Sequence, residues 1–401
     1  MRYDARLDRL NFLLADVRGG LGPYVGVFLV TRAGWDQATL GAVLAVSGLL
    51  GVTLQAPIGA LIDATRRKRA LLLAGVAALA ASALAIAWAP TLPVVLAADL
   101  AMAVLGAVFA PTVAAITLGL VGSGGLARRL GRNAALDRAG NVFVAGLAGL
   151  VGWAFSQRAV FHLVPLFAAL TAAAVLAIPA RAIDHERACG LGPDRAGAGR
   201  PAGWRVLLER RPLLVLAAGA ALFHFANAPM LPLLGQRLAL AHPGAESPLV
   251  AACIVTAQLA TIPVALLVGA KADAWGRRRL LLAGFAALPL RGLLCAGVDH
   301  PAGLVATQVL DGVGGGAFDA LLPLVLADVT RGTGRYNAAR GVVGTVQGVG
   351  GSLSNAAAGL VVARAGYDAA FIALAAVGLA ALLLVLAAMP ETRPGAPADG
   401  T

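Results

Sequence analysis

The side chains best suited to chemistry in this sequence are ionisable and amide groups inside long apolar segments. They are Asp16, Arg18, Asp99, His224, Asn227, Arg291, Asp311 and Asp319. Carboxylates and imidazoles bind and release protons, and carboxylates also pair with cationic solutes. A charge at the centre of a bilayer costs about 2.5–3.5 kcal/mol on insertion scales, so such residues are functional candidates by default. The set therefore predicts a group of proton- or solute-binding residues.

Asp16 best meets the requirements of a proton-binding carboxylate. It lies in an apolar segment beside the helix-breaking run Gly19–Pro23, and residues 227–232, Asn-Ala-Pro-Met-Leu-Pro, form a second break in a later segment. Interrupted helices at corresponding places in two halves mark the binding site of many transporters. Arg18 is two residues away and need not face Asp16 on a helix. Asp311 is the second candidate for the proton site.

Each of these residues also has a structural interpretation. Arg291 and Asp311 lie at comparable depths on adjacent helices and could form an ion pair. Asp16 and Arg18 could be satisfied near the cytoplasmic mouth, Asp99 could face water, and His224 could be a hydrogen-bonded packing residue.

Two short charged segments lie 210 residues apart between apolar runs. Residues 59–68 read Gly-Ala-Leu-Ile-Asp-Ala-Thr-Arg-Arg-Lys, and residues 269–278 read Gly-Ala-Lys-Ala-Asp-Ala-Trp-Gly-Arg-Arg. Each begins with small residues, contains one acid and ends in a basic cluster. A duplicated charged segment predicts two similar halves.

The composition is that of an all-α membrane protein. The 401 residues are 59% hydrophobic and only 13% charged, with a mean hydropathy of +0.82, whereas soluble proteins are about a quarter charged. Apolar runs long enough to span a membrane predict twelve helices, at about 10–31, 37–60, 70–89, 94–121, 134–156, 160–179, 212–235, 248–268, 280–298, 302–328, 339–363 and 367–389. We expect two six-helix bundles, 1–179 and 212–389, a linker over 180–211 and a disordered tail over 390–401.

The basic residues follow the predicted loops. With the N-terminus in the cytoplasm, 25 of the 32 Lys and Arg residues lie in cytoplasmic segments and four in the opposite loops. This asymmetry predicts that both termini are cytoplasmic. It also accounts for the net charge of +12, so nucleic acid is not an expected partner.

The two charged segments resemble the signature Gly-x-Leu-x-Asp-x-x-Gly-Arg-Arg/Lys of the major facilitator superfamily. Arg66 replaces the glycine of the first copy, and Lys271 replaces the leucine of the second. The resemblance implies a rocker-switch transporter whose cavity is lined by helices 1, 4, 7 and 10. It also implies a conformational latch in which Asp63 and Asp273 contact the starts of helices 11 and 5. The residues of that latch are Gly59, Asp63, Arg67, Lys68, Arg138, Gly269, Asp273, Arg277, Arg278 and Arg340. The alternative is that the basic clusters only fix topology.

The expected function is proton-coupled export of a small organic solute, a drug or a metabolite, by a monomer in the bacterial inner membrane. Proton-coupled uptake or facilitated diffusion is the alternative within transport, and a non-transporting receptor is a remote one. No nucleophile–base set, metal-ligand cluster or phosphate-binding loop is evident, so we expect neither an enzyme nor a cofactor.

The charge asymmetry predicts the topology directly. Cysteine labelling or reporter fusions should place Arg67, Arg195, Arg278 and the C-terminus in the cytoplasm. Accessibility of position 195 from outside the cell would reverse this orientation.

Overall fold

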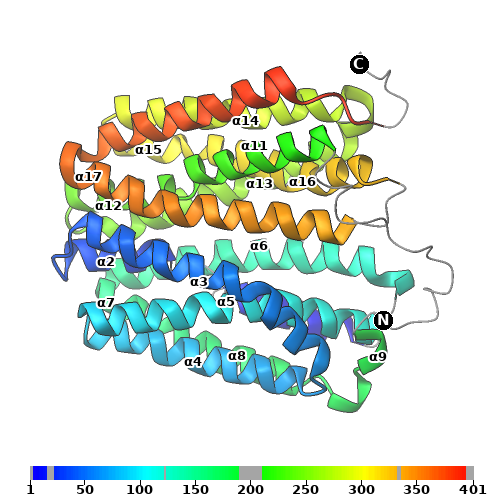
Figure 1. Ribbon diagram of the computed structural model, residues 1–401. Helices are drawn as coiled ribbons and strands as arrows, with labels where there is room; N and C mark the ends of the chain where they lie inside the picture. Colours follow the sequence, from blue (N-terminus) through cyan, green and yellow to red (C-terminus); the bar gives the residue numbers. More distant parts are fainter. Residues whose placement is uncertain (1–2, 16–21, 122, 189–209, 332–335, 394–401) are drawn as a thin grey trace. The chain divides into compact units, whose positions relative to one another are not determined.

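The computed structural model of the chain describes residues 3–15, 22–121, 123–188, 210–331 and 336–393. Within these ranges the chain is helical, with short turns and no strand. It forms two compact units (Figure 1). Unit 1 comprises Met1–Trp35, Val46–Ala196 and Ala239–Ala252, and unit 2 comprises Asp36–Ala45, Gly197–Leu238 and Cys253–Thr401.

Unit 1 is built mainly from the first half of the chain. Its helices are α1 (Asp4–Ala15), α2 (Gly22–Thr31), most of α3 (Gln37–Ala64), α4 (Lys68–Trp88), α5 (Leu92–Val121), α6 (Ser123–Ala154), α7 (Gln157–Val160) and α8 (Leu163–Leu176), followed by η2 (Ala180–Ala182) and α9 (His185–Ala188). Helix α1 packs on α6 and α8, and α4 packs on α5 and α8.

Unit 2 is built mainly from the second half. Its helices are α11 (Arg211–Asn227), α12 (Met230–Ala241), α13 (Glu246–Trp275), α14 (Arg277–Gly297), α15 (Pro301–Ala306), α16 (Gln308–Val329) and α17 (Tyr336–Ala388), with the end of α12 and the start of α13 assigned to unit 1. Helix α11 packs on α17, and α14 packs on α16 and α17.

The all-helical membrane fold is confirmed. Ten helices within the described residues are long and apolar enough to cross a membrane. One of them, α17, contains Gly366 at φ 86°, ψ 176°, and Figure 1 shows its orange part leading into a turn from which its red part runs back. This break agrees with the predicted boundary between 363 and 367. The predicted helix 10–31 is represented by α1 and α2, and residues 16–21 lie outside the described ranges.

Close helix packing in unit 2 depends on small residues and on aromatic rings. The ring of Phe223 stacks on Phe318 at 4.7 Å between centroids and lies 5.0 Å from that of Phe285. A Cβ at Gly312 would collide with the Ala257 carbonyl of α13, and one at Gly316 would lie 3.1 Å from the Thr261 carbonyl oxygen. The glycine-rich run of α16 therefore serves helix packing, as its position in an apolar helix indicates.

Helix boundaries differ from the predicted ones where charges pair. The sequence predicts a loop before residue 134, whereas α6 begins at Ser123. Arg129 and Arg132 on this extension pair with acids of α1, so their charges are compatible with a continuous helix. Similarly, α3 and α13 continue to Ala64 and Trp275, through most of the two charged segments.

The predicted linker and tail are both structured at their beginnings. Residues 180–188 form η2 and α9, and residues 189–209 lie outside the described ranges. In the segment predicted to be disordered, Glu391 accepts hydrogen bonds from the backbone N–H groups of Arg277, at 2.9 Å, and Arg278, at 3.2 Å. The carboxylate thus takes the place of an N-cap at α14, where helix N–H groups lack partners.

The backbone at Gly276 and the charge of Glu391 both suit this capping role. Gly276 has a φ of 90°, and a Cβ there would collide with the Glu391 carboxylate. Burial raises the pKa of Glu391, but hydrogen bonds from four backbone N–H groups outweigh it, so the net pKa lies below the ordinary 4.5. The native state therefore favours the charged carboxylate.

Replacing Glu391 with alanine should lower the free energy of unfolding by about 1 kcal/mol, the usual contribution of an N-cap. Because the folded-state pKa is lowered, this stabilisation is present above pH 4.5 and is lost as the pH falls through the lower value. Thermal unfolding in detergent, compared with Glu186→Ala at an exposed site of α9, measures the effect. Equal melting temperatures for the wild type and Glu391→Ala at neutral pH would contradict the cap.

Candidate functional site

Arg291, itself fully buried, is the centre of a polar cluster in unit 2. Its side chain has no exposed surface. The guanidinium donates hydrogen bonds to Asp311 Oδ1 at 2.6 Å, Gln308 Oε1 at 2.7 Å and Asn227 Oδ1 at 2.8 Å. These four residues, hereafter the Arg291 cluster, bring α11, α14 and α16 together.

The local sequence explains how each member reaches the centre. Helix α11 ends at Asn227 and α12 begins at Met230, so the predicted break at 227–232 is confirmed. Gln308 and Asp311 are three residues apart on α16, a spacing that places both side chains on one helix face. Arg291 lies opposite them on α14, which packs against α16.

The charge balance of the cluster is set by a single carboxylate. Among the described residues, Asp311 is the acid within salt-bridge distance of Arg291, and the other two acceptors are neutral amide oxygens. Arg291 Nε has no hydrogen-bond acceptor there. The Asp311 side chain is 18% exposed, whereas that of Arg291 is 0% exposed, so Asp311 is the more accessible charged partner.

Gln308 is a member that sequence reasoning missed. The sequence draws attention to charged residues, and a glutamine in an apolar helix is more often a packing residue. Its position three residues before Asp311, on the same helix face, was the signal that the sequence offered.

The other candidate residues in the membrane do not join this cluster through any described contact. His224 Nδ1 lies 3.1 Å from the Ala220 carbonyl oxygen, and its ring meets Phe318 edge-on at 5.2 Å. It therefore has the surroundings of a packing residue. Asp319 is exposed on α16, and Asp99 is partly buried on α5. Asp16 and Arg18 lie outside the described residues.

The first charged segment closes the end of α3 with a lysine. The Lys68 side chain is buried, and its Nζ donates to the carbonyl oxygens of Ile62 and Thr65, each at 2.9 Å. A cation at a helix C-terminus satisfies carbonyls that lack helical partners. Arg67 is exposed, and Gly59 lies on α3. Asp63 belongs to α3 by its backbone, and its side chain lies outside the description.

The second segment has a different set of contacts. The buried Arg277 pairs with Asp273 at 2.5 Å and with Asp328, at the end of α16, at 3.0 Å. Arg278 donates to the Leu386 carbonyl oxygen at 2.7 Å, and Arg393 donates to the Asp273 and Ala274 carbonyl oxygens. Arginines of this segment and of the tail thus join α13, α14, α16 and α17.

The remaining latch candidates are placed but their role is untested. Gly269 is exposed on α13, Arg340 is exposed on α17, and Arg138 is partly buried on α6. The latch contacts implied by the family resemblance stay a prediction. Asp328 is a further residue that sequence reasoning missed. Its side chain is only 6% exposed and also pairs with Arg331 at 3.0 Å.

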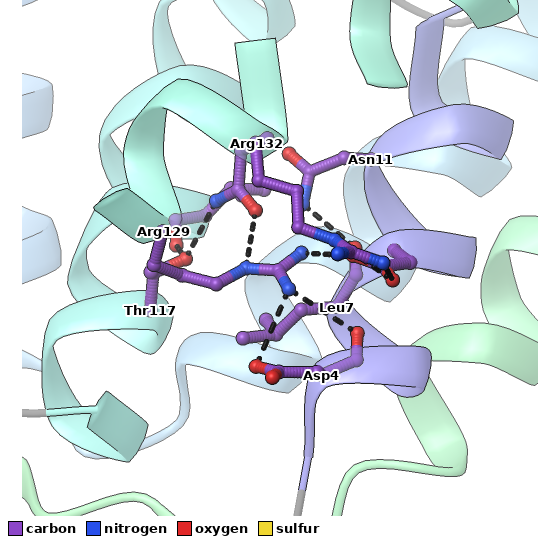
Figure 2. Close-up of polar contacts among 9 residues, drawn as sticks. Asp4, Leu7, Asn11, Thr117, Arg129 and Arg132 are labelled. Carbon is purple, nitrogen blue, oxygen red and sulfur yellow. Dashed lines mark hydrogen bonds and ion pairs between the residues drawn. The ribbon is translucent and has the colours of Figure 1, made fainter. Parts of the chain in front are cut away.

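Unit 1 contains a comparable ion-pair network at the start of α6 (Figure 2). Arg129, 3% exposed, pairs with Asp8 and Asp4, while Arg132 also binds Asp8, at 2.6 Å. Asn133 accepts from Arg129 Nε at 2.8 Å and donates to Thr117 Oγ1 at 3.1 Å. The network therefore joins α1, α5 and α6.

The electrostatics of this network favour the ionised acids. The hydrogen bond from Arg132 is the largest influence on Asp8, and with Arg129 it lowers the pKa of that carboxyl despite partial burial. Sequence reasoning missed the network, although Asp4 and Asp8 have the i, i+4 spacing of one helix face.

The two aspartates of the charged segments can be tested against a matched neighbour. Asp273→Asn and Asp63→Asn should leave expression largely intact and slow transport, because each removes a charge that biases one conformation by about 1–3 kcal/mol. Asp328→Asn should instead lower expression, since it removes the most buried carboxylate of Arg277. Transport and expression are measured together in cells. If Asp273→Asn and Asp63→Asn both transport at the parental rate, the charged segments act only as topology signals.

Comparisons with known proteins agree with this architecture. Residues 10–257 and 221–401 both match the Major Facilitator Superfamily. The chain is 46% identical over 394 residues to the uncharacterized MFS-type transporter Rv2456c of Mycobacterium tuberculosis, an alignment that covers 98% of this chain and 94% of that protein.

Solved transporter structures share the fold at low identity. A crystal structure of a mutant of the nucleoside transporter NupG has a TM-score of 0.80 at 14% identity, with 96% of this chain and 100% of that chain covered. A transporter of the POT family, in complex with a thioalcohol-conjugated peptide, has a TM-score of 0.75 at 12% identity, with 96% and 95% covered. The chain is a multi-pass membrane transporter that belongs to the Major Facilitator Superfamily.

Proposed function

We propose that this transporter exports a small organic solute in exchange for protons, by alternating access across the bacterial inner membrane. The observation that carries the proposal is the buried pair of Arg291 and Asp311, in which one partly accessible carboxylate neutralises one inaccessible guanidinium.

Protonation of Asp311 has a large electrostatic consequence. A protonated Asp311 leaves Arg291 as a buried cation whose described acceptors are neutral amide oxygens. Leaving a buried charge without its partner costs about 3–5 kcal/mol. Proton binding therefore favours a conformation in which Arg291 is stabilised differently, and this links a proton to a structural change.

Competition at a carboxylate supplies the exchange. A cationic solute and a proton cannot both neutralise the same ionised group, so they occupy it in turn. A single acid then suffices for antiport, and the inward proton gradient drives the solute outward. Asp16 stays the first sequence-based candidate for this acid, and Asp311 is the candidate whose surroundings are described.

Per amount of folded protein, Asp311→Asn should abolish concentration of the solute against its gradient and preserve downhill exchange, because asparagine keeps the side-chain size but cannot carry the proton. The assay uses proteoliposomes with an imposed proton gradient, screened over cationic and neutral organic compounds. Asp299→Asn, at an acid that is 95% exposed, is the control and should behave as the wild type.

The possible outcomes test separately whether transport is coupled to protons and in which direction the solute moves. Normal concentrative transport by Asp311→Asn would overturn its role and make Asp16→Asn the next variant. Movement of solute in the same direction as protons would show uptake instead of export. Solute exchange that is insensitive to the proton gradient in the wild type would indicate facilitated diffusion.

A further inference from the structure

A basic cavity lies between α1 and α8 in unit 1, apart from the residues discussed above. It has a volume of about 200 Å³ and is lined by Arg6, Arg9 and Leu13 from α1 and by Leu170, Ala173 and Ala177, among others, from α8. The volume is roughly that of six or seven water molecules, which suits a polar headgroup. Its walls combine two cations with apolar side chains.

Helical spacing separates these arginines from the acids of the same helix. At 3.6 residues per turn, positions 6, 9 and 13 lie on one face of α1, and positions 4 and 8 lie on nearly the opposite face. Asp4 and Asp8 are used by Arg129 and Arg132 of α6. With the described residues, neither Arg6 nor Arg9 forms an ion pair, and the Arg6 guanidinium lies over the Tyr3 ring, 5.6 Å from its centroid.

The apolar wall continues away from the arginines along α8. Leu170 is 44% exposed and Leu166 is 52% exposed, and both lie in the segment Gln157–Leu176, whose length and composition suit a membrane span. The exposed surface of such a helix contacts acyl chains. The cavity thus offers guanidinium groups at the end of a membrane helix and hydrocarbon contacts beyond them.

We propose that this cavity binds one anionic phospholipid, whose headgroup phosphate contacts Arg6 and Arg9 and whose glycerol and upper acyl region lie along Leu13, Leu170 and Ala173. Arginine forms strong charge-assisted hydrogen bonds with phosphate, and basic pockets at membrane helix ends bind anionic headgroups. An inorganic phosphate would satisfy the arginines but not the apolar wall.

Native mass spectrometry of the purified full chain, titrated with dioleoylphosphatidylglycerol, tests the proposal. Each of Arg6→Gln and Arg9→Gln should weaken binding of the tightest lipid about fivefold. Ala173→Phe keeps both charges but fills the wall, and it should also weaken binding. Arg211→Gln removes an exposed arginine from the start of α11 in unit 2 and should leave that binding unchanged.

Dioleoylphosphatidylcholine and inorganic phosphate complete the comparison. The proposal expects weaker binding of the zwitterionic lipid and no displacement of phosphatidylglycerol by millimolar phosphate. Unchanged lipid binding in the Arg6→Gln/Arg9→Gln double variant would overturn it. An equal loss in Arg211→Gln would do so too, because general surface charge would then explain the binding. Normal binding by Ala173→Phe would place the lipid elsewhere, since that substitution leaves both arginines in place.

Discussion

The requirement that a buried guanidinium be neutralised and hydrogen-bonded organises the interior of unit 2. Arg291 has no contact with solvent, and its donors reach acceptors on two other helices. An arginine within an apolar helix is costly unless these contacts exist. The end of α11 at Asn227 and the one-face spacing of Gln308 and Asp311 are therefore parts of a single arrangement. The function proposed for this transporter uses Asp311, the carboxylate of that arrangement, whose side chain reaches accessible surface.

The same requirement recurs at the ends of the membrane helices. Arg129 joins α1 to α6, and Arg277 joins α13, α14 and α16. The two charged segments look alike in sequence, yet their contacts differ. In the first, Lys68 binds the carbonyl oxygens at the end of α3. In the second, Arg393 from the chain end binds the carbonyl oxygens of α13, while Glu391 caps α14. Similar motifs thus support different local networks in the two units.

Much of this architecture can be predicted from the order of residues along the chain. Apolar length gives the membrane helices, and duplicated charges indicate the two similar halves. Proline and asparagine at 227–232 give the break after α11. Contacts between helices are harder to predict from the sequence. Gln308 and Asp328 were missed because their importance depends on which side chain faces them from α14, which periodicity along α16 does not specify. The extension of α6 to Ser123 was missed for the same reason: its arginines look like loop residues until the acids of α1 are placed beside them.

A double-mutant cycle on Arg291 and Asp311 tests the central physical claim most directly. Thermal unfolding in detergent is compared for the wild type, Arg291→Gln, Asp311→Asn and the double variant. The account predicts that each single variant is strongly destabilised, because one charge stays buried without its partner, and that the double variant regains much of the loss. Destabilisation by the two substitutions that simply adds in the double variant would show that the pair is not coupled, and would contradict the account.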